Sequence, residues 1–283
     1  MGTTINRALY DQVCLLNSKK MTRLYSTSFS LGAASLASRH RNGIYAVYGF
    51  VRLADEIVDT FHDQPQSELL SAFESDTWTA IEQRFSLNPV LHAFQMVYHE
   101  FQFTPDLVDT FLRSMEMDLT DKFHDRESYE QYIVGSAEVV GLMCLRIFIQ
   151  GKDEQYEQLK PFAMKLGAAF QKINFLRDMK DDYEKLGRTY FPSADLSRFD
   201  QDTKDFIEQE IEEDFRIAYE GIKQLPRDSR FGVYVAYVYY YRLFQKIKST
   251  PAPHLLQSRI RIPNQKKYSL FLTSYFRHSF NLL

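Results

Sequence analysis

Apolar side chains recur at three- and four-residue intervals along most of this chain. Such spacing is typical of helices that bury one face. It predicts helices over residues 7–20, 22–37, 42–61, 66–84, 105–119, 127–149, 154–186, 203–223 and 230–248. No internal repeat or Ser/Gly-rich linker interrupts them, and most prolines, Pro161 among them, are expected at breaks or first turns. The pattern predicts an all-α fold with residues 1–283 in a single domain.

Composition agrees with long helices, because the 283 residues include only 11 glycines and 9 prolines. Aromatic residues make up 15% of the chain and are abundant enough to line a large apolar interior. The net charge of −3 argues against a nucleic-acid partner bound through overall positive charge. Cys14 and Cys144 suggest no disulfide framework, which favours a reducing, cytoplasmic compartment.

No uninterrupted apolar run reaches the roughly 18 residues of a membrane span. The nearest candidate, residues 268–283, is broken by Arg277 and His278. We expect a packed terminal helix there, with a role at the membrane surface as the alternative.

One predicted helix carries a polar stripe within apolar surroundings. At 100° per residue, Tyr48, Arg52, Asp55 and Asp59 share one narrow face. Acidic side chains on an enclosed helix need a compensating cation. A single Asp-x3-Asp pair is more often a solvated helix face, so this stripe alone is weak evidence for a site.

A second predicted helix repeats the arrangement far along the sequence. Asp178 and Asp182 share a face with Asn174 and Gln171, one and two turns earlier respectively, and Asp181 lies at the edge of that face. The alternative role of Gln171 and Asn174 is to satisfy buried backbone groups. Two such helices together indicate a site more strongly than either helix alone.

Paired acidic helices suit the binding of magnesium and a diphosphate. Mg²⁺ prefers octahedral oxygen ligands and usually combines one or two carboxylates with substrate phosphates; Mn²⁺ is an alternative. Arg52, Arg177 and Arg188 are candidates for contacts with the phosphates. A di-iron bundle would need Glu-x-x-His pairs, and neither helix has one in its sequence.

These motifs, in this order, resemble those of the squalene/phytoene synthase family. The first acidic motif is Tyr48–Asp59, and the second is Gln171–Asp182 followed by Gly187–Pro192. Three further segments resemble the family's diphosphate-binding serines, cavity wall and C-terminal basic segment: Tyr25–Ser30, Tyr132–Gly141 and Arg259–Lys267. The resemblance covers residues 22–270 and implies an isoprenoid-synthase helical bundle around a central apolar cavity.

The resemblance also implies roles for individual residues. The catalytic residues would be Asp55, Asp59, Asp178, Asp182, Tyr48 and Arg52. The metal ligands would be Asp55, Glu56, Asp59, Asp178, Asp181 and Asp182. The substrate would be bound by Ser26, Ser28, Phe29, Ala33, Tyr132, Gln171, Asn174, Arg177, Arg188, Tyr190, Tyr240 and Arg259. Ser26 and Ser28 could instead cap a helix, and Tyr48 and Tyr132 could be ordinary core tyrosines.

One position departs from the family pattern. Where the family usually has Ala-Gly in the cavity wall, this chain has Ala137-Glu138. A glutamate there needs a charged partner or a rotation away from the cavity.

The implied reaction is head-to-head coupling of two prenyl diphosphates. The small residues Gly32, Ala33 and Ala34 follow Phe29 and leave room in a tunnel wall, which favours C20 substrates, geranylgeranyl diphosphate, and phytoene as product. NADPH is not expected, because the Gly-x-Gly-x-x-Gly fingerprint is missing from the sequence. The alternatives are a dehydrosqualene or squalene synthase acting on farnesyl diphosphate, and a non-catalytic helical assembly factor. The insoluble product implies peripheral contact with a membrane for its release, and the oligomeric state stays open.

Overall fold

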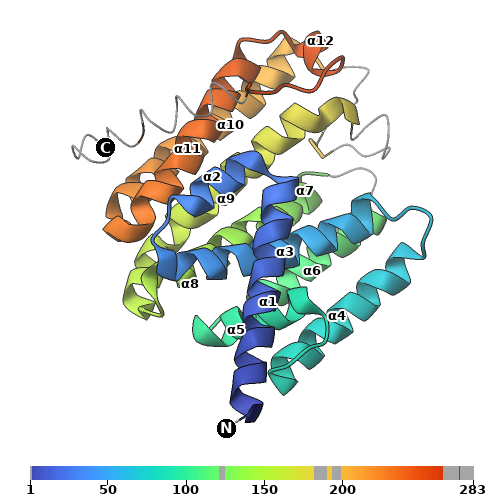
Figure 1. Cartoon of the computed structure of the whole chain (residues 1–283). Helices are drawn as coiled ribbons and strands as arrows, with labels where there is room; N and C mark the ends of the chain where they lie inside the picture. The colour runs from blue at the N-terminus through green and yellow to red at the C-terminus, as the bar shows by residue number, and fades with distance from the viewer. Residues whose placement is uncertain (1, 121–124, 182–189, 193–198, 264–273, 275–283) are drawn as a thin grey trace.

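The computed structural model describes residues 2–120, 125–181, 190–192, 199–263 and 274, and these contain helices and no strands. The first half holds α1 (Gly2–Tyr25), α2 (Thr27–Ala34), α3 (Ser38–Asp59), α4 (Gln66–Gln83), α5 (Pro89–Glu100) and α6 (Pro105–Thr120). The second half holds α7 (Arg126–Ile133), the π-helical turn η1 (Val134–Glu138), α8 (Val139–Ile149), α9 (Asp153–Asp181), α10 (Gln201–Gln224), α11 (Arg227–Lys248) and α12 (Ala252–Leu255). The all-α prediction is therefore confirmed (Figure 1).

Two predicted helices are interrupted in the structure, and one proline lies inside a helix. The expected helix over 22–37 is two helices, because Ser26 adopts an extended backbone and its side chain caps α2. The expected helix over 127–149 is interrupted by η1. Pro161 lies inside α9, at the loss of one backbone hydrogen bond, and not at a break or first turn.

Helix α5 is absent from the predicted segments, although its start carries a recognisable signal. The side chain of Asn88 accepts hydrogen bonds from Val90 N and Leu91 N, and Pro89 occupies the first helical turn. The predicted continuation to residue 186 and most of the predicted terminal helix over 268–283 lie outside the described residues.

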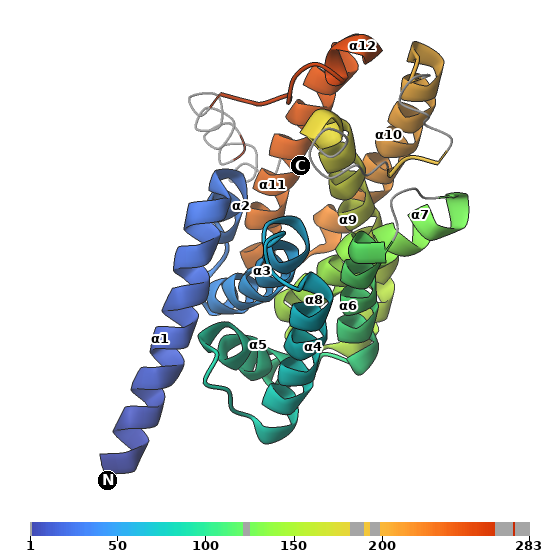
Figure 2. The ribbon, with the colours of Figure 1, turned by 90° about the vertical axis from the view of Figure 1, so that its right-hand side faces the viewer.

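The helices enclose two groups of buried side chains. The first centres on Phe50, whose ring stacks on that of Phe94 at 3.9 Å and contacts Phe73 and Phe111. Burying each such side chain contributes about 1.5–3 kcal/mol. The second group packs around α9 and includes side chains of α7, α10 and α11. Figure 2 shows α9 with α10 and α11 beside it. Tyr237 packs against both groups, so the two are continuous at that side chain.

The segment Arg126–Ile149 is long and apolar enough to cross a membrane, but 67% of its apolar window is buried inside the molecule. It packs against α6 and α9. We therefore assign it to the protein core.

Candidate active site

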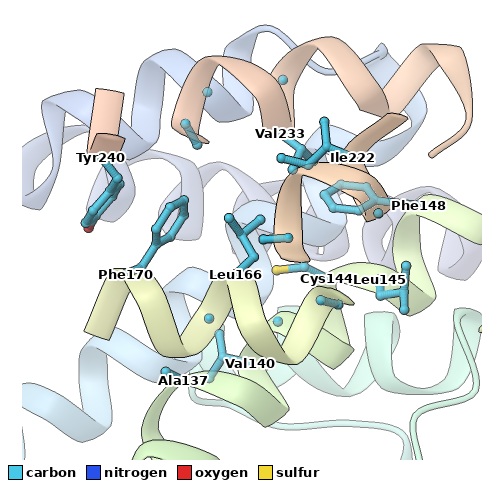
Figure 3. Close-up of a pocket in the computed structure, with 18 of the residues that line it drawn as sticks. Ala137, Val140, Cys144, Leu145, Phe148, Leu166, Phe170, Ile222, Val233 and Tyr240 are labelled. Atoms are coloured by element: carbon cyan, nitrogen blue, oxygen red, sulfur yellow. The ribbon is translucent and has the colours of Figure 1, made fainter. Parts of the chain in front are cut away.

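An apolar cavity lies between α2, α3, α8, α9, α10 and α11 (Figure 3). Its volume is about 270 Å³, and the empty space reaches about 1210 Å³ when the open mouth is included. Polar groups gather at one end, where Asn174 is hydrogen-bonded to both Gln171 and Tyr240. Leu145 and Phe148 lie toward the other end (Figure 3). The cavity can hold a long hydrocarbon chain with a polar group at one end.

Helix α2 forms one wall of this cavity. Phe29, Gly32 and Ala33 line it, whereas Ala34 is exposed on the other side of the helix. A Cβ atom on Gly32 would lie 3.4 Å from the carbonyl oxygen of Gly232 in α11, so the two helices approach closely there. Of the three small residues predicted to line the tunnel, two do so.

The stripe on α3 forms a charged cluster at its C-terminal end. Arg52 pairs with Glu56, and its Nη1 lies 3.7 Å from Asp55 Oδ2. Removal from bulk water, with the charges of Asp59 and Asp118, raises the pKa of Asp55 to about 8, although Arg52 opposes the shift. Burial and the neighbouring acids therefore outweigh the effect of Arg52 on the pKa of Asp55.

Asp118 of α6 belongs to this cluster and was missed in the sequence. It is buried, and it accepts hydrogen bonds from Tyr132 Oη at 2.8 Å and Tyr190 Oη at 3.0 Å. The signal available was an aspartate between the apolar residues of an amphipathic helix. Of the two aspartates that follow it in sequence, Asp125 caps α7 and is exposed, and Asp121 lies outside the described residues.

Tyr48, the first residue of the α3 stripe, contacts Phe29 and Ser26 of the neighbouring segment. The ring of Tyr48 stacks on Phe29 with centroids 4.7 Å apart. Burial raises the pKa of Tyr48 to about 12, while Arg52 and a hydrogen bond with Ser26 lower it. The Ser26 Oγ also accepts from Phe29 N at 3.2 Å, so Ser26 does cap a helix, as the alternative interpretation held. Ser28 is half-buried in the first turn of α2.

The second acidic stripe ends α9 beside two arginines. Arg177 Nε donates to Asp178 Oδ1 at 2.9 Å, and Arg259 Nε lies 2.7 Å from the same oxygen. Desolvation lowers the pKa of Arg177, but its hydrogen bond with Asp178 outweighs this and the net shift is upward. One turn earlier, Tyr240 Oη lies 3.4 Å from Asn174 Oδ1. The structure thus brings Arg259 to the second motif.

Aromatic side chains connect the two acidic stripes. Tyr132, which bonds to Asp118, has its ring 5.9 Å from that of Phe175 in α9. Tyr240 of α11, which contacts Asn174 of α9, is close enough to Tyr48 to raise the pKa of the Tyr48 hydroxyl.

Among the residues that the structure describes, no three His, Cys, Asp or Glu side chains form a group able to hold a metal. Asp182 and Arg188 of the second motif lie outside the described residues, and Asp181 is half-buried at the end of α9.

Glu138 is turned away from the cavity. The π-helical turn leaves Ser136 and Ala137 in the cavity wall, whereas Glu138 is absent from it and is buried elsewhere. Burial raises the pKa of Glu138, and the charges of Lys165 and Lys172 lower it. Both a rotation and cationic neighbours therefore accommodate the unusual glutamate.

Comparison with known proteins identifies the family. The model of the squalene/phytoene synthase family matches residues 22–266. The chain belongs to the squalene/phytoene synthase family. Within this family of prenyltransferases, it is 30% identical to the 4,4'-diapophytoene synthase of Staphylococcus haemolyticus over 66% of this chain and 65% of that protein. It is 25% identical to the phytoene synthase of Arthrospira platensis over 94% of this chain and 93% of that protein.

A solved structure of a dehydrosqualene synthase in complex with a ligand has the same fold. It superposes with a TM-score of 0.80 at 23% identity, covering 94% of this chain and 96% of that one. The squalene synthase HpnC from Alicyclobacillus acidocaldarius superposes with a TM-score of 0.74 at 19% identity, covering 85% and 95%. The described helices thus adopt the helical fold of these synthases.

Proposed function

We propose that this squalene/phytoene synthase family member couples two molecules of geranylgeranyl diphosphate head to head, through prephytoene diphosphate, to phytoene. One observation carries the proposal: the apolar cavity begins at Asn174 and Tyr240, which lie beside Asp178. A prenyl diphosphate has the matching division into a charged head and an apolar tail.

The length of the cavity supports a C20 substrate. Along α9 its wall extends from Asn174 to Leu159, fifteen residues or about 22 Å at 1.5 Å per residue. Ala33 faces the cavity from α2 and has only a methyl side chain. One isoprene unit is comparable in length to a helical turn, about 5.4 Å. A bulkier residue at position 33 would remove the room that the longer chain needs.

The acidic side chains fit magnesium. Burial and the charges of Asp59 and Asp118 raise the pKa of Asp55 to about 8, and a bound divalent cation would stabilise its charged form. We assign the ligands to Asp55, Glu56, Asp59, Asp178, Asp181 and Asp182. Bound Mg²⁺ would stabilise the negative charge of the departing diphosphate.

The chain's own cations would hold the diphosphate. Arg52 Nε is buried and has no hydrogen-bond partner among the described residues, so it can donate to a phosphate oxygen. Arg177 and Arg259 meet at Asp178, and we assign Arg188 to the same task. When the C1–O bond of the first substrate breaks, the diphosphate carries both bonding electrons and stays among these residues.

Aromatic side chains would protect the resulting allylic cation. Phe170 stacks on Tyr240 at 3.9 Å, and Phe29 stacks on Tyr48 at 4.7 Å. Their faces attract cations, and their rings exclude water that would trap the cation as an alcohol. The double bond of the second substrate then attacks, and loss of a proton gives a cyclopropylcarbinyl diphosphate. Its ionisation, rearrangement and final proton loss give the triene.

A C15 reaction is the second candidate. It is favoured by the similarity to a diapophytoene synthase and to a dehydrosqualene synthase structure. We propose that NADPH takes no part, so that the coupled product keeps its central double bond.

The test is identification of the hydrocarbon. The full chain is incubated with Mg²⁺ and separately with C15 and C20 diphosphates, with and without NADPH, and the products are analysed by mass spectrometry. We expect phytoene from the C20 substrate in both conditions. Dehydrosqualene from the C15 substrate alone would support the second candidate, and a requirement for NADPH would indicate squalene formation. No hydrocarbon from either substrate would favour the non-catalytic assembly factor.

A further inference from the structure

The outer face of α1 carries a stripe of exposed apolar side chains. Leu9, Val13, Leu16 and Leu24 are 58%, 50%, 52% and 75% exposed. The first three follow one another at four- and three-residue intervals, and Leu24 lies on the same side two turns later. We call these four residues the α1 stripe. Large apolar side chains gathered on one exposed face mark an interaction surface.

The stripe faces outward because the opposite face of α1 is fixed. Cys14, Ser18 and Thr22 are fully buried on that side. A Cβ atom on Gly49 of α3 would lie 3.0 Å from Ser18 Oγ, so the two helices are in close contact. In both views α1 runs along the outside of the molecule (Figures 1 and 2).

The charges around the stripe have one sign. Lys20 lies on the stripe and Arg23 beside it, and both are exposed. Neither forms an ion pair with any residue that the structure describes. The only acid in the sequence of α1, Asp11, lies on the inner side, where it pairs with Arg7 and His92.

We propose that the α1 stripe docks on the surface of an anionic lipid membrane. A helix with exposed leucines flanked by lysine and arginine suits the boundary between acyl chains and anionic headgroups. A second copy of this face fits less well, because it would bring no acid to Lys20 and Arg23. Docking would place the membrane beside α2, whose Phe29 and Gly32 line the cavity. The proposal rests on the surface of α1 and not on the reaction.

The test is sedimentation of the full chain with lipid vesicles. We expect binding to vesicles of phosphatidylcholine with phosphatidylglycerol and much weaker binding to phosphatidylcholine alone. The triple variant Leu9→Gln, Val13→Gln, Leu16→Gln should bind at least about tenfold more weakly. The pair Lys20→Gln, Arg23→Gln should lose about thirtyfold on anionic vesicles, and added salt should reduce wild-type binding.

Phe206→Gln is the matched control, since Phe206 is an exposed apolar residue of α10 with 58% exposure. Circular dichroism checks that every variant is folded. The readout of the test is vesicle binding, which does not depend on enzyme activity. No binding of the wild type to anionic vesicles would overturn the proposal. Equal binding of the triple variant and Phe206→Gln would also overturn it. A dimer in sedimentation velocity that the triple variant converts to monomers, without vesicle binding, would assign the stripe to a second copy.

Discussion

A Cβ atom at Gly221 would lie 2.2 Å from the Cβ of Phe162, and both residues line the cavity. Phe162 lies on α9 twelve residues before Asn174, or about 18 Å at 1.5 Å per residue, and so far from the polar end. Because the crowded atom of Phe162 is its Cβ, a rotation of the ring does not relieve the contact. Gly221 therefore fixes how closely α10 approaches α9 where the tail of a long chain would lie.

We predict that Gly221→Ala lowers the use of the C20 substrate relative to the C15 substrate. The added methyl must push Phe162 or α10 out of place, which distorts the far part of the cavity and destabilises the fold by about 1–3 kcal/mol. Competition assays with both diphosphates measure the ratio. The double variant Gly221→Ala, Phe162→Gly removes the crowded Cβ atom and should recover C20 use, and an unchanged ratio in the single variant would contradict the prediction.

The raised pKa of Asp55 predicts a pH dependence of magnesium binding. Protons compete with the metal for this carboxylate below a pH of about 8, so affinity for Mg²⁺ should increase as the pH rises toward 8. Asp118→Asn removes a neighbouring negative charge, which should lower the pKa of Asp55 and move the midpoint to lower pH. Titration calorimetry at several pH values measures both effects.

The control for Asp118→Asn is Asp76→Asn, because Asp76 is an exposed aspartate of α4. It should leave the midpoint at the wild-type value. Coincident midpoints in wild type and Asp118→Asn would show that Asp118 does not act on Asp55.

The raised pKa of Asp55 also predicts that stability depends on pH when no metal is bound. Folded Asp55 holds its proton up to about pH 8, whereas the unfolded chain releases it near 3.8. The unfolded state therefore binds fewer protons in this window, and the free energy of unfolding from this group falls as the pH rises through it. Asp55→Asn should gain thermal stability relative to wild type between pH 5 and 8, measured in EDTA. A constant difference in melting temperature would contradict this linkage.

Arg259 should contribute to substrate binding more than its neighbours. It contacts Asp178 at 2.7 Å, so Arg259→Ala should raise KM for the prenyl diphosphate by about 10- to 100-fold, the range expected for a lost charge-assisted contact. Arg259→Lys should restore part of this loss. Arg261→Ala, an exposed position two residues on, is the control and should keep the wild-type KM. Equal effects of the two alanine variants would argue for a general loss of positive charge.

Glu138 should matter for stability and not for chain length. Its side chain lies outside the cavity wall, near Lys165 and Lys172. Glu138→Gly should therefore cost about 1 kcal/mol, as glycine does inside a helix, and leave the ratio of C15 to C20 products unchanged. Thermal melts and the competition assay measure the two properties, and an altered product ratio would place Glu138 in the cavity wall.

Residues three or four apart on one helix could be grouped from the sequence, because helical geometry alone brings them together. This explains why Asp55 and Asp59, or Gln171 and Asn174, were found as stripes. Asp118 was missed because its partners Tyr132 and Tyr190 are 14 and 72 residues away, and only packing reveals them. Periodicity predicts that a segment is helical more reliably than it predicts where the helix begins and ends. The break at Ser26 was therefore not predicted.

The central claim is that this cavity couples two prenyl diphosphates with metal help, and release of diphosphate tests it most directly. The account predicts that the wild type with Mg²⁺ releases two diphosphates for each hydrocarbon formed. It predicts that Asp55→Asn and Asp178→Asn, folded by circular dichroism, release almost none. Folded wild type that releases no diphosphate from C15 or C20 substrates, or variants as active as wild type, would contradict the account.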